Sequence, residues 1–149
     1  MESVGLKESD LTLMHDFSIQ QMYLKLRGDF SKCPRRRLTC NNYVAPRWVF
    51  ILYLALNGRL QTIDKIAKWS VIDDLICPLC TEVPETLDHL LFKCSISSMI
   101  WKKILQWQGV DKGPYEWKDE VVWAIDHVKG NSAKAHIYRM SLAACVYFI

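Results

Sequence analysis

Apolar residues recur along most of the chain at the three- and four-residue spacing of an amphipathic α-helix. This period predicts a series of helices over residues 19–26, 46–56, 63–69, 96–107, 117–128 and 133–148. We therefore expect an all-α fold, a small helical domain of five to seven helices.

Capping residues mark where several of these helices begin. Ser18, Thr62 and Ser132 each stand just before an apolar period, where a hydroxyl can accept a hydrogen bond from a free backbone N–H. Pro46 suits a first helical position, and the residues after it are apolar on every side. We expect that segment to be the buried central helix, and the apolar stripe of 19–26 also to be core.

The densest chemical signal lies between residues 77 and 94. Cys77, Cys80, His89 and Cys94 have the spacing C-x2-C-x8-H-x4-C. Two thiolates of a C-x2-C turn can converge on one ion, and an H-x4-C pair at a helix end can complete a tetrahedron. Three cysteines and one histidine leave no open coordination position, so we expect one structural Zn2+ and not a catalytic one.

The local geometry must bring Cys94 back to the metal. On a regular helix, five residues would place Cys94 about 140° away from His89. We therefore expect the helix, which Thr86 can cap, to end or distort near Lys93. The alternative is that four residues of these types lie close together by accident, as buried thiols and a surface histidine.

Three further cysteines, Cys33, Cys40 and Cys145, lie outside this motif. Because we expect an intracellular protein, they should be free thiols. Cys33 and Cys40 could belong to a second metal site, but no histidine lies near them in the sequence.

Length and composition are compatible with one folded domain. Half of the 149 residues are hydrophobic, which is enough for a sizeable core. We expect a loose N-terminal arm over 1–16 and a single domain over 17–149, whose last apolar period is still running at Ile149, as in a truncated reading frame. Neither a signal peptide nor a stretch of roughly 20 apolar residues is present. We expect an intracellular protein, nuclear or cytoplasmic, without a membrane partner.

A basic stretch over residues 31–42, which we expect to be an exposed loop, precedes the expected central helix. It contains four basic residues and no acidic one, namely Lys32, Arg35, Arg36 and Arg37. Together with the net charge of +3, it permits contacts with the phosphates of RNA or DNA, or a role in nuclear import. Lys102 and Lys103 are further candidates for such contacts. The alternative is an exposed, solvated loop whose charge is incidental, with the two lysines only solubilising their helix.

The sequence gives no indication of catalysis. The glycine-rich phosphate-binding motifs, G-x-S-x-G and H-E-x-x-H are absent. Asp73 and Asp74 resemble the paired aspartates of a reverse-transcriptase centre, but Val71 stands where an aromatic residue is needed. We therefore expect no enzymatic activity and no small-molecule substrate.

Several segments of the chain occur together in one known family. They are Ala45-Pro46-Arg47, Asn57-Gly58-Arg59-Leu60-Gln61-Thr62, Cys77-Pro78-Leu79-Cys80, Glu85-Thr86, His89-Leu90, Phe92, Cys94 and Trp101. Residues 17–108 resemble the reverse-transcriptase zinc-binding domain of plant non-LTR (LINE-type) retroelements. The chain departs from that family at Leu38-Thr39-Cys40, where a tryptophan is common, and at Trp48. The resemblance implies nucleic-acid association in retrotransposition.

Two classes of function remain open. The first is a zinc-dependent nucleic-acid-binding module derived from a retroelement. The second is a zinc-stapled protein–protein interaction module with no nucleic-acid role. Clustering of the basic stretch with Lys102 and Lys103 would favour the first, and an exposed surface of tryptophan and leucine would favour the second.

Overall fold

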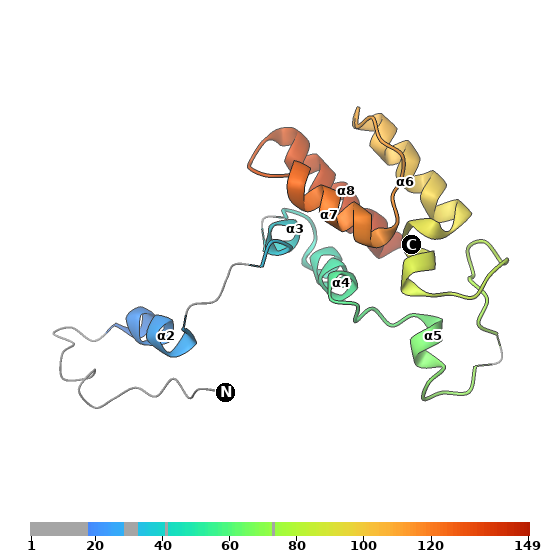
Figure 1. The fold of residues 1–149 in the computed structure, drawn as a ribbon, viewed down its shortest axis with the longest axis horizontal. Coiled ribbons are helices and arrows are strands. Elements are labelled where there is room, and N and C mark those ends of the chain that lie inside the picture. The colour runs from blue at the N-terminus through green and yellow to red at the C-terminus, as the bar shows by residue number, and fades with distance from the viewer. Residues whose placement is uncertain (1–17, 29–32, 41, 73) are drawn as a thin grey trace. The chain divides into compact units, whose positions relative to one another are not determined.

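The computed structural model describes residues 18–28, 33–40, 42–72 and 74–149, and it is mainly helical (Figure 1). Its elements are α2 (Ile19–Arg27), α3 (Arg36–Cys40), α4 (Pro46–Leu56), α5 (Ile63–Ile66), the π-helical turn η1 (His89–Lys93), α6 (Ser95–Trp107), α7 (Trp117–His127) and α8 (Ala133–Phe148). Within the described ranges, β pairing is limited to an isolated bridge between Ile76 and Pro84. The expected all-α class is confirmed. None of the described helices has both the length and the apolar character needed to cross a membrane.

The chain divides into two compact units, residues 1–33 and 34–149. The boundary falls inside the span 17–149 that the sequence groups as one domain, and the expected arm over 1–16 lies outside the described residues. The first unit contains α2. Ile19 and Tyr23 of its apolar stripe are 77% and 60% exposed, so the expectation that this stripe belongs to the core is wrong.

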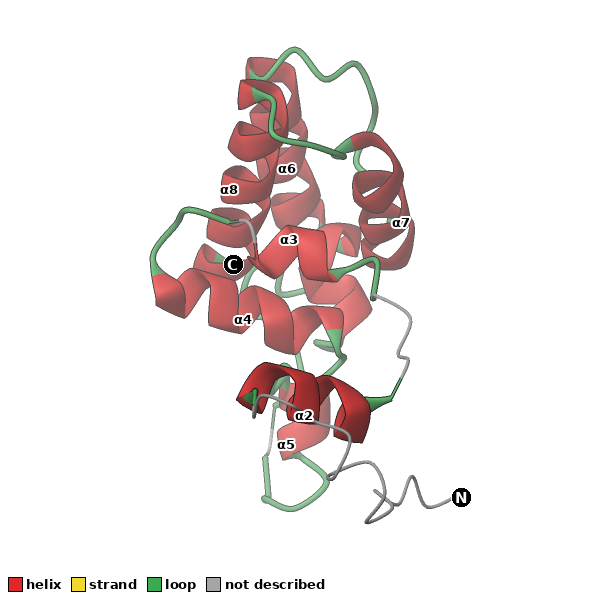
Figure 2. Ribbon diagram, turned by 90° about the vertical axis from the view of Figure 1, so that its left-hand side faces the viewer, coloured by secondary structure: helices red, strands yellow, loops and turns green. Residues whose placement is uncertain are grey.

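In the second unit, α4 crosses the C-terminal end of α8 (Figure 2). Trp48 near the start of α4 packs edge-on against Phe148, with ring centroids 5.3 Å apart. The inner face of α4 buries Leu52, Ala55 and Leu56. Burial on every face was expected and is wrong, because Phe50 and Tyr53 are 58% and 47% exposed. A second neighbour, α3, spans only five residues and leaves that outer face uncovered.

The basic stretch is not the exposed loop that the sequence indicates. Residues 36–40 form α3, and Leu38, only 1% exposed, joins the main core. Asn42 ties the end of α3 to α8, because its Nδ2 donates to Leu38 O at 3.1 Å and to Arg139 O at 2.9 Å. A single apolar side chain thus anchors a segment that is otherwise polar.

Helices α6, α7 and α8 supply most of the remaining core. Trp101 of α6 is fully buried; it stacks on Phe92 at 5.1 Å and meets Tyr138 of α8 edge-on at 5.6 Å. Truncating a buried aromatic side chain typically costs about 3–5 kcal/mol, so Trp101 fixes the position of α6. The predicted cap of α8 is confirmed, since Ser132 Oγ accepts a hydrogen bond from Ala135 N at 3.2 Å.

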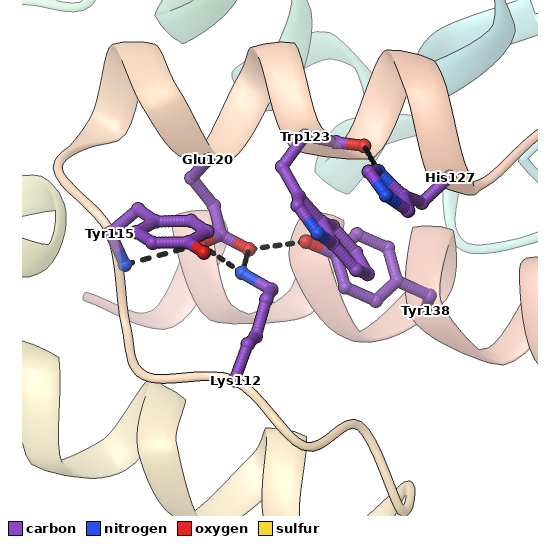
Figure 3. A network of polar contacts seen from close by, with 6 residues as sticks. All are labelled: Lys112, Tyr115, Glu120, Trp123, His127 and Tyr138. Atoms are coloured by element: carbon purple, nitrogen blue, oxygen red, sulfur yellow. Dashed lines mark hydrogen bonds and ion pairs between the residues drawn. The ribbon is translucent and has the colours of Figure 1, made fainter.

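A buried ion pair links the loop before α7 to the interior (Figure 3). Lys112 Nζ contacts both carboxylate oxygens of Glu120, and the two side chains are 6% and 0% exposed. Tyr138 Oη and Tyr115 N also donate to this carboxylate, and the ammonium lies 4.4 Å from the centre of the Trp123 ring. Burial lowers the pKa of Lys112 and raises that of Tyr138. The cluster holds both charges inside the fold by pairing them.

The short helix α5 is capped by a residue that is distant in the sequence. Thr62 stands at the N-cap position, but its side chain makes no bond to the helix backbone and instead donates to Asp64. The carboxylate of Glu85 accepts a hydrogen bond from Ile63 N at 2.8 Å. Glu85 therefore takes the role predicted for Thr62, and it connects α5 to the segment that carries the expected metal ligands.

Candidate metal centre and basic residues

The four predicted zinc ligands lie together directly before α6. The sulfur atoms of Cys77, Cys80 and Cys94 and a ring nitrogen of His89 all lie within 4.8 Å of one another. Cys77 and Cys94 are fully buried, whereas the other two are partly exposed. With Leu90, the two buried cysteines form a small cluster distinct from the main core.

The chemistry and the spacing of these donors fit a zinc ion. Bonds of about 2.3 Å to sulfur and 2.0–2.1 Å to nitrogen give tetrahedral edges of roughly 3.5–3.8 Å. Cys80 Sγ and His89 Nε2 are 3.3 Å apart, and every other pair of donors lies within 4.8 Å. Small side-chain movements would therefore bring all four donors to Zn2+.

A tight turn presents the first two cysteines. Thr81 N donates to Cys77 O at 2.9 Å, and Thr81 has a φ of 56°, in the left-handed region. Cys77 N donates in turn to Val83 O at 2.8 Å, and the bridge between Ile76 and Pro84 closes the loop. This backbone holds both sulfur atoms on one side of the turn, where they can share an ion.

The second pair of ligands depends on a broken helix. Thr86 Oγ1 accepts a hydrogen bond from His89 N at 3.1 Å, which confirms the predicted cap. Helical geometry then fails at Leu91, with a ψ of 85°, and at Phe92, with a φ of 80°. The break was expected slightly later in the chain. Because Cys94 follows in an extended conformation, its thiol lies beside the other ligands and not across the helix from them.

Residues of α6 hold this break in place although they supply no ligand. Ser97 Oγ accepts a hydrogen bond from Phe92 N at 3.2 Å and donates to Cys94 O at 3.3 Å. The Phe92 ring stacks on Trp101. A bulky residue in the left-handed region costs roughly 1–3 kcal/mol, so the conformation of Phe92 depends on these contacts. The metal centre therefore includes the first two turns of α6.

Backbone donors and burial affect the thiols in opposite directions. The N–H of Glu82 is the main cause that lowers the pKa of Cys80 to about 7, with smaller contributions from Val83 N–H and His89. Burial raises the pKa of Cys77 above 9.0. Zinc binds thiolates, so a zinc ion held here would release the protons of both thiols, and its charge would compensate for the burial of Cys77.

The basic candidates lie on more than one surface. Arg35 Nη1 donates to Leu56 O at 2.8 Å, at the C-terminal end of α4, and so has a structural contact. Two helices carry the other described candidates as exposed side chains, Arg36 and Arg37 on α3 and Lys102 and Lys103 on α6. In the view of Figure 1, α7 and α8 lie between α3 and α6. Lys32 lies outside the described residues.

Arg139 is a charged residue that the sequence analysis did not single out. It stands four residues after Ala135 and three before Leu142, on the buried stripe of α8, and is 1% exposed. In the sequence, this residue could have been identified as a single arginine at an otherwise apolar position of the helix. In the structure it shares a polar pocket with Arg36 and Arg37.

The segment that carries the metal centre matches a known protein family. No curated protein and no solved structure matches the chain. Residues 17–101, more than half of the chain, match the family described as zinc-binding in reverse transcriptase. This span contains all four candidate ligands and extends to Trp101, which supports the helix break. The chain therefore belongs to the family of zinc-binding domains of reverse transcriptases.

Proposed function

We propose that this chain is a nucleic-acid-binding module stabilised by one structural zinc ion, with no catalytic activity of its own. Four side chains bind the ion, those of Cys77, Cys80, His89 and Cys94, and exposed basic residues contact the phosphates of RNA or DNA. We also propose that the module derives from the reverse transcriptase of a plant non-LTR retroelement, since the motifs between Ala45 and Trp101 resemble that group.

The structural role of zinc follows from the closed set of ligands. Four protein ligands complete a tetrahedron and leave no position for a water or a substrate. Such sites contribute about 10–16 kcal/mol in zinc-finger peptides, comparable with the roughly 5–15 kcal/mol that stabilise a whole domain. The ion would hold together two segments, the cysteine turn and the broken helix, that share few apolar contacts.

The observation that carries the nucleic-acid proposal is a set of basic groups without acidic partners. Among the residues that the structure describes, Arg36, Arg37, Lys102 and Lys103 are exposed and have no carboxylate within 4.0 Å. Other exposed basic residues, such as Arg47, Arg59, Lys68 and Lys134, share this property. Three exposed lysines are ion-paired, namely Lys93 with Glu116, Lys118 with Asp88 and Lys129 with Asp126. Unpaired basic groups can neutralise phosphates and release their counterions without first breaking an internal pair.

A salt titration of RNA and DNA binding tests this proposal. For single strands, log K should fall with log salt at a slope of about 0.7 per phosphate contacted, which gives about 2–3 for three or four contacts. Replacing Arg36, Arg37, Lys102 and Lys103 with glutamine should weaken the binding of all nucleic-acid sequences about equally and flatten the slope. The control variant Lys93→Gln/Lys118→Gln removes ion-paired charges and should flatten it less.

The decisive measurement is oligonucleotide binding by the wild-type protein at low salt, where electrostatic attraction is least screened. If the zinc-loaded chain binds no oligonucleotide there, the nucleic-acid proposal fails. A strong preference for one sequence would also contradict it, because phosphate contacts carry no sequence information.

Exposed tryptophans favour a second candidate, a zinc-stapled protein–protein interaction module. Trp69 and Trp107 are 74% and 77% exposed, and tryptophan is enriched among the residues that dominate protein interfaces. This candidate predicts no salt-dependent binding of oligonucleotides, so the same titration separates the two functions.

A further inference from the structure

A small polar pocket lies between α3 and the loop that joins α7 to α8. Its volume is about 260 Å3. The lining residues are three arginines, a cysteine and two loop residues, namely Arg36, Arg37, Arg139, Cys40, Gly130 and Asn131. Because drug-sized ligands occupy roughly 300–1,000 Å3, this volume suits a smaller group. With no acidic residue in its lining, the pocket is electropositive.

Arg139 is the buried member of this set, and its contacts are all with neutral groups. Its Nη1 donates to Gly130 O at 3.1 Å and to Val128 O at 3.4 Å, and its Nη2 donates to His136 Nδ1 at 3.1 Å. Its Nε has no hydrogen-bond partner in the part of the chain that the structure describes. Over the same residues, no carboxylate lies within 4.0 Å of this guanidinium.

A buried cation without a counter-charge is energetically unfavourable. Lys112, the other buried cation of this unit, is compensated by the carboxylate of Glu120. Arg139 has no such group, and burial lowers its pKa, although an arginine side chain remains charged at neutral pH. An anion that enters the pocket from solvent would supply the missing charge.

We infer that this pocket binds one phosphate group, held by Arg36, Arg37 and Arg139. A guanidinium presents paired N–H donors in a plane that matches two phosphate oxygens, which the point charge of a lysine cannot do. The inference deepens the proposed function, because it names the residues that would hold a nucleic-acid phosphate. The inference rests on the proposed function only in taking the phosphate from a nucleic acid. Binding of inorganic phosphate to the pocket can be tested independently of that function.

The pocket is built before any ligand arrives. Leu38 anchors α3 in the core, and Asn42 joins Leu38 O to Arg139 O, so the helix that carries two of the arginines is fixed beside the third. Thr39 Oγ1 adds a bond to Arg36 O at 3.2 Å. A prearranged backbone reduces the ordering cost that binding would otherwise incur.

The first test titrates inorganic phosphate into the zinc-loaded full chain at constant ionic strength. Binding is followed by NMR through the backbone amides of residues 36–40 and 130–132. The variant Arg36→Gln/Arg37→Gln should bind phosphate about tenfold more weakly or worse, because it loses charge-assisted hydrogen bonds. The matched variant Lys102→Gln/Lys103→Gln removes the same charge from α6 and should change the affinity by less than about threefold. Absence of saturation in the wild type, or equal losses in the two variants, would overturn the inference.

A second measurement needs no substitution, which avoids any loss of folding on replacing the buried Arg139. Cys40 lines the pocket and is exposed, and Cys33 is exposed outside it. Saturating phosphate should slow the alkylation of Cys40 by iodoacetamide several-fold and leave Cys33 unchanged, as read by peptide mass spectrometry. Unchanged rates at Cys40, or equal slowing at both cysteines, would contradict a phosphate in the pocket.

The last test uses oligonucleotides with a 5′-phosphate or a 5′-hydroxyl. Tighter binding of the phosphorylated strand assigns the pocket to a terminal phosphate, and equal binding assigns it to a backbone phosphate. If both strands bind but the two double variants lose affinity equally, the pocket inference fails and the proposed function stands. If phosphate saturates the pocket and neither strand binds, the proposed function fails and the pocket stands.

Discussion

Cys94 is the ligand whose position depends most on its neighbours. It is fully buried, and it reaches the other donors because the two residues Leu91 and Phe92 leave helical geometry before it. The three cysteines outside the motif differ from it in their surroundings: Cys33 and Cys40 are exposed, and Cys145 lies in the main core. This difference separates the expected effects of replacing them.

We expect Cys94→Ser to lower the zinc content sharply, because it removes one of four ligands. The triple variant with Cys33, Cys40 and Cys145 all replaced by alanine should keep one zinc per chain and lose about 1–3 kcal/mol of stability, mainly at the buried site. Elemental analysis of protein purified without added metal measures both. Loss of zinc in the triple variant would reveal a different set of ligands.

Cys145 also predicts a dependence of stability on pH. Burial, and to a lesser extent the charge of Glu120, raises its pKa from 9.0 to about 12. The unfolded chain therefore releases this proton near pH 9, while the folded protein keeps it. Stability present below pH 9 is lost as the pH rises towards 12, by up to about 1.4 kcal/mol per pH unit.

Cys145→Ala should remove this part of the slope. Urea denaturation of the wild type and the variant at several pH values between 9 and 12 measures the difference in slope, with exposed Cys40→Ala as the control. Parallel curves for wild type and Cys145→Ala would show that the thiol has the same pKa in the folded and the unfolded chain.

At the scale of elements, the broken helix η1 contains the strained residue Phe92 and presents the candidate ligands His89 and Cys94. Ser97 bonds to both sides of the break, through Phe92 N and Cys94 O, whereas the side chain of the next residue, Ser98, makes no hydrogen bond within the described ranges. Ser97→Ala would leave a buried N–H without a partner, which costs about 1–3 kcal/mol. Zinc affinity should fall several-fold, as measured by competition with a coloured chelator. An equal loss in the control Ser98→Ala would mean that Ser97 has no special role at the break.

The cap of α5 gives a prediction at the same scale. Glu85→Ala removes the acceptor for Ile63 N and should cost about 0.5–2 kcal/mol, the usual range for a helix cap. Amide hydrogen exchange should accelerate over 63–66, since those residues lose their tie to the zinc-binding segment. Glu82→Ala, at an exposed position of the same turn, is the control. Unchanged exchange in Glu85→Ala would assign the cap to another group.

At the scale of the second unit, two cores meet at η1 and Ile149. The main core combines side chains from α3, α4, η1, α6, α7 and α8, and the small cluster around Cys77, Leu90 and Cys94 lies beside it. Ile149 packs against both clusters. A metal ion held by the four candidate ligands and the packing of the helices would therefore stabilise each other across η1 and Ile149.

The buried ion pair of Lys112 and Glu120 is the main polar feature of the larger core. Lys112→Met and Glu120→Gln should each destabilise the fold by about 3–5 kcal/mol, because each leaves a buried partner uncompensated. The double variant should lose less than the sum, with a coupling of about 0.5–3 kcal/mol in urea denaturation. The exposed pair Lys129 and Asp126 is the control, with an expected coupling below about 1 kcal/mol. Additive losses at the buried pair would contradict the contacts in Figure 3.

Features that depend on residues a few positions apart could be predicted from the sequence. The four ligands, the cap by Thr86 and the cap by Ser132 are of this kind, because a turn or a helix end fixes the distance between near neighbours. Helical periods also located most of the helices. They did not say which apolar faces would be covered, and so the faces of α2 and α4 were predicted to be buried when part of each is exposed.

Tertiary structure decided the contacts between distant segments. Glu85 caps a helix that begins 22 residues earlier, and Asn42 bonds to Arg139 across 97 residues. The pairing of Lys112 with Glu120, and the meeting of Arg36 and Arg37 with Arg139, likewise need helices to pack first. The spacing of residues along the sequence does not predict such contacts, because the free energy of a buried charge depends on which groups the packed helices place around it.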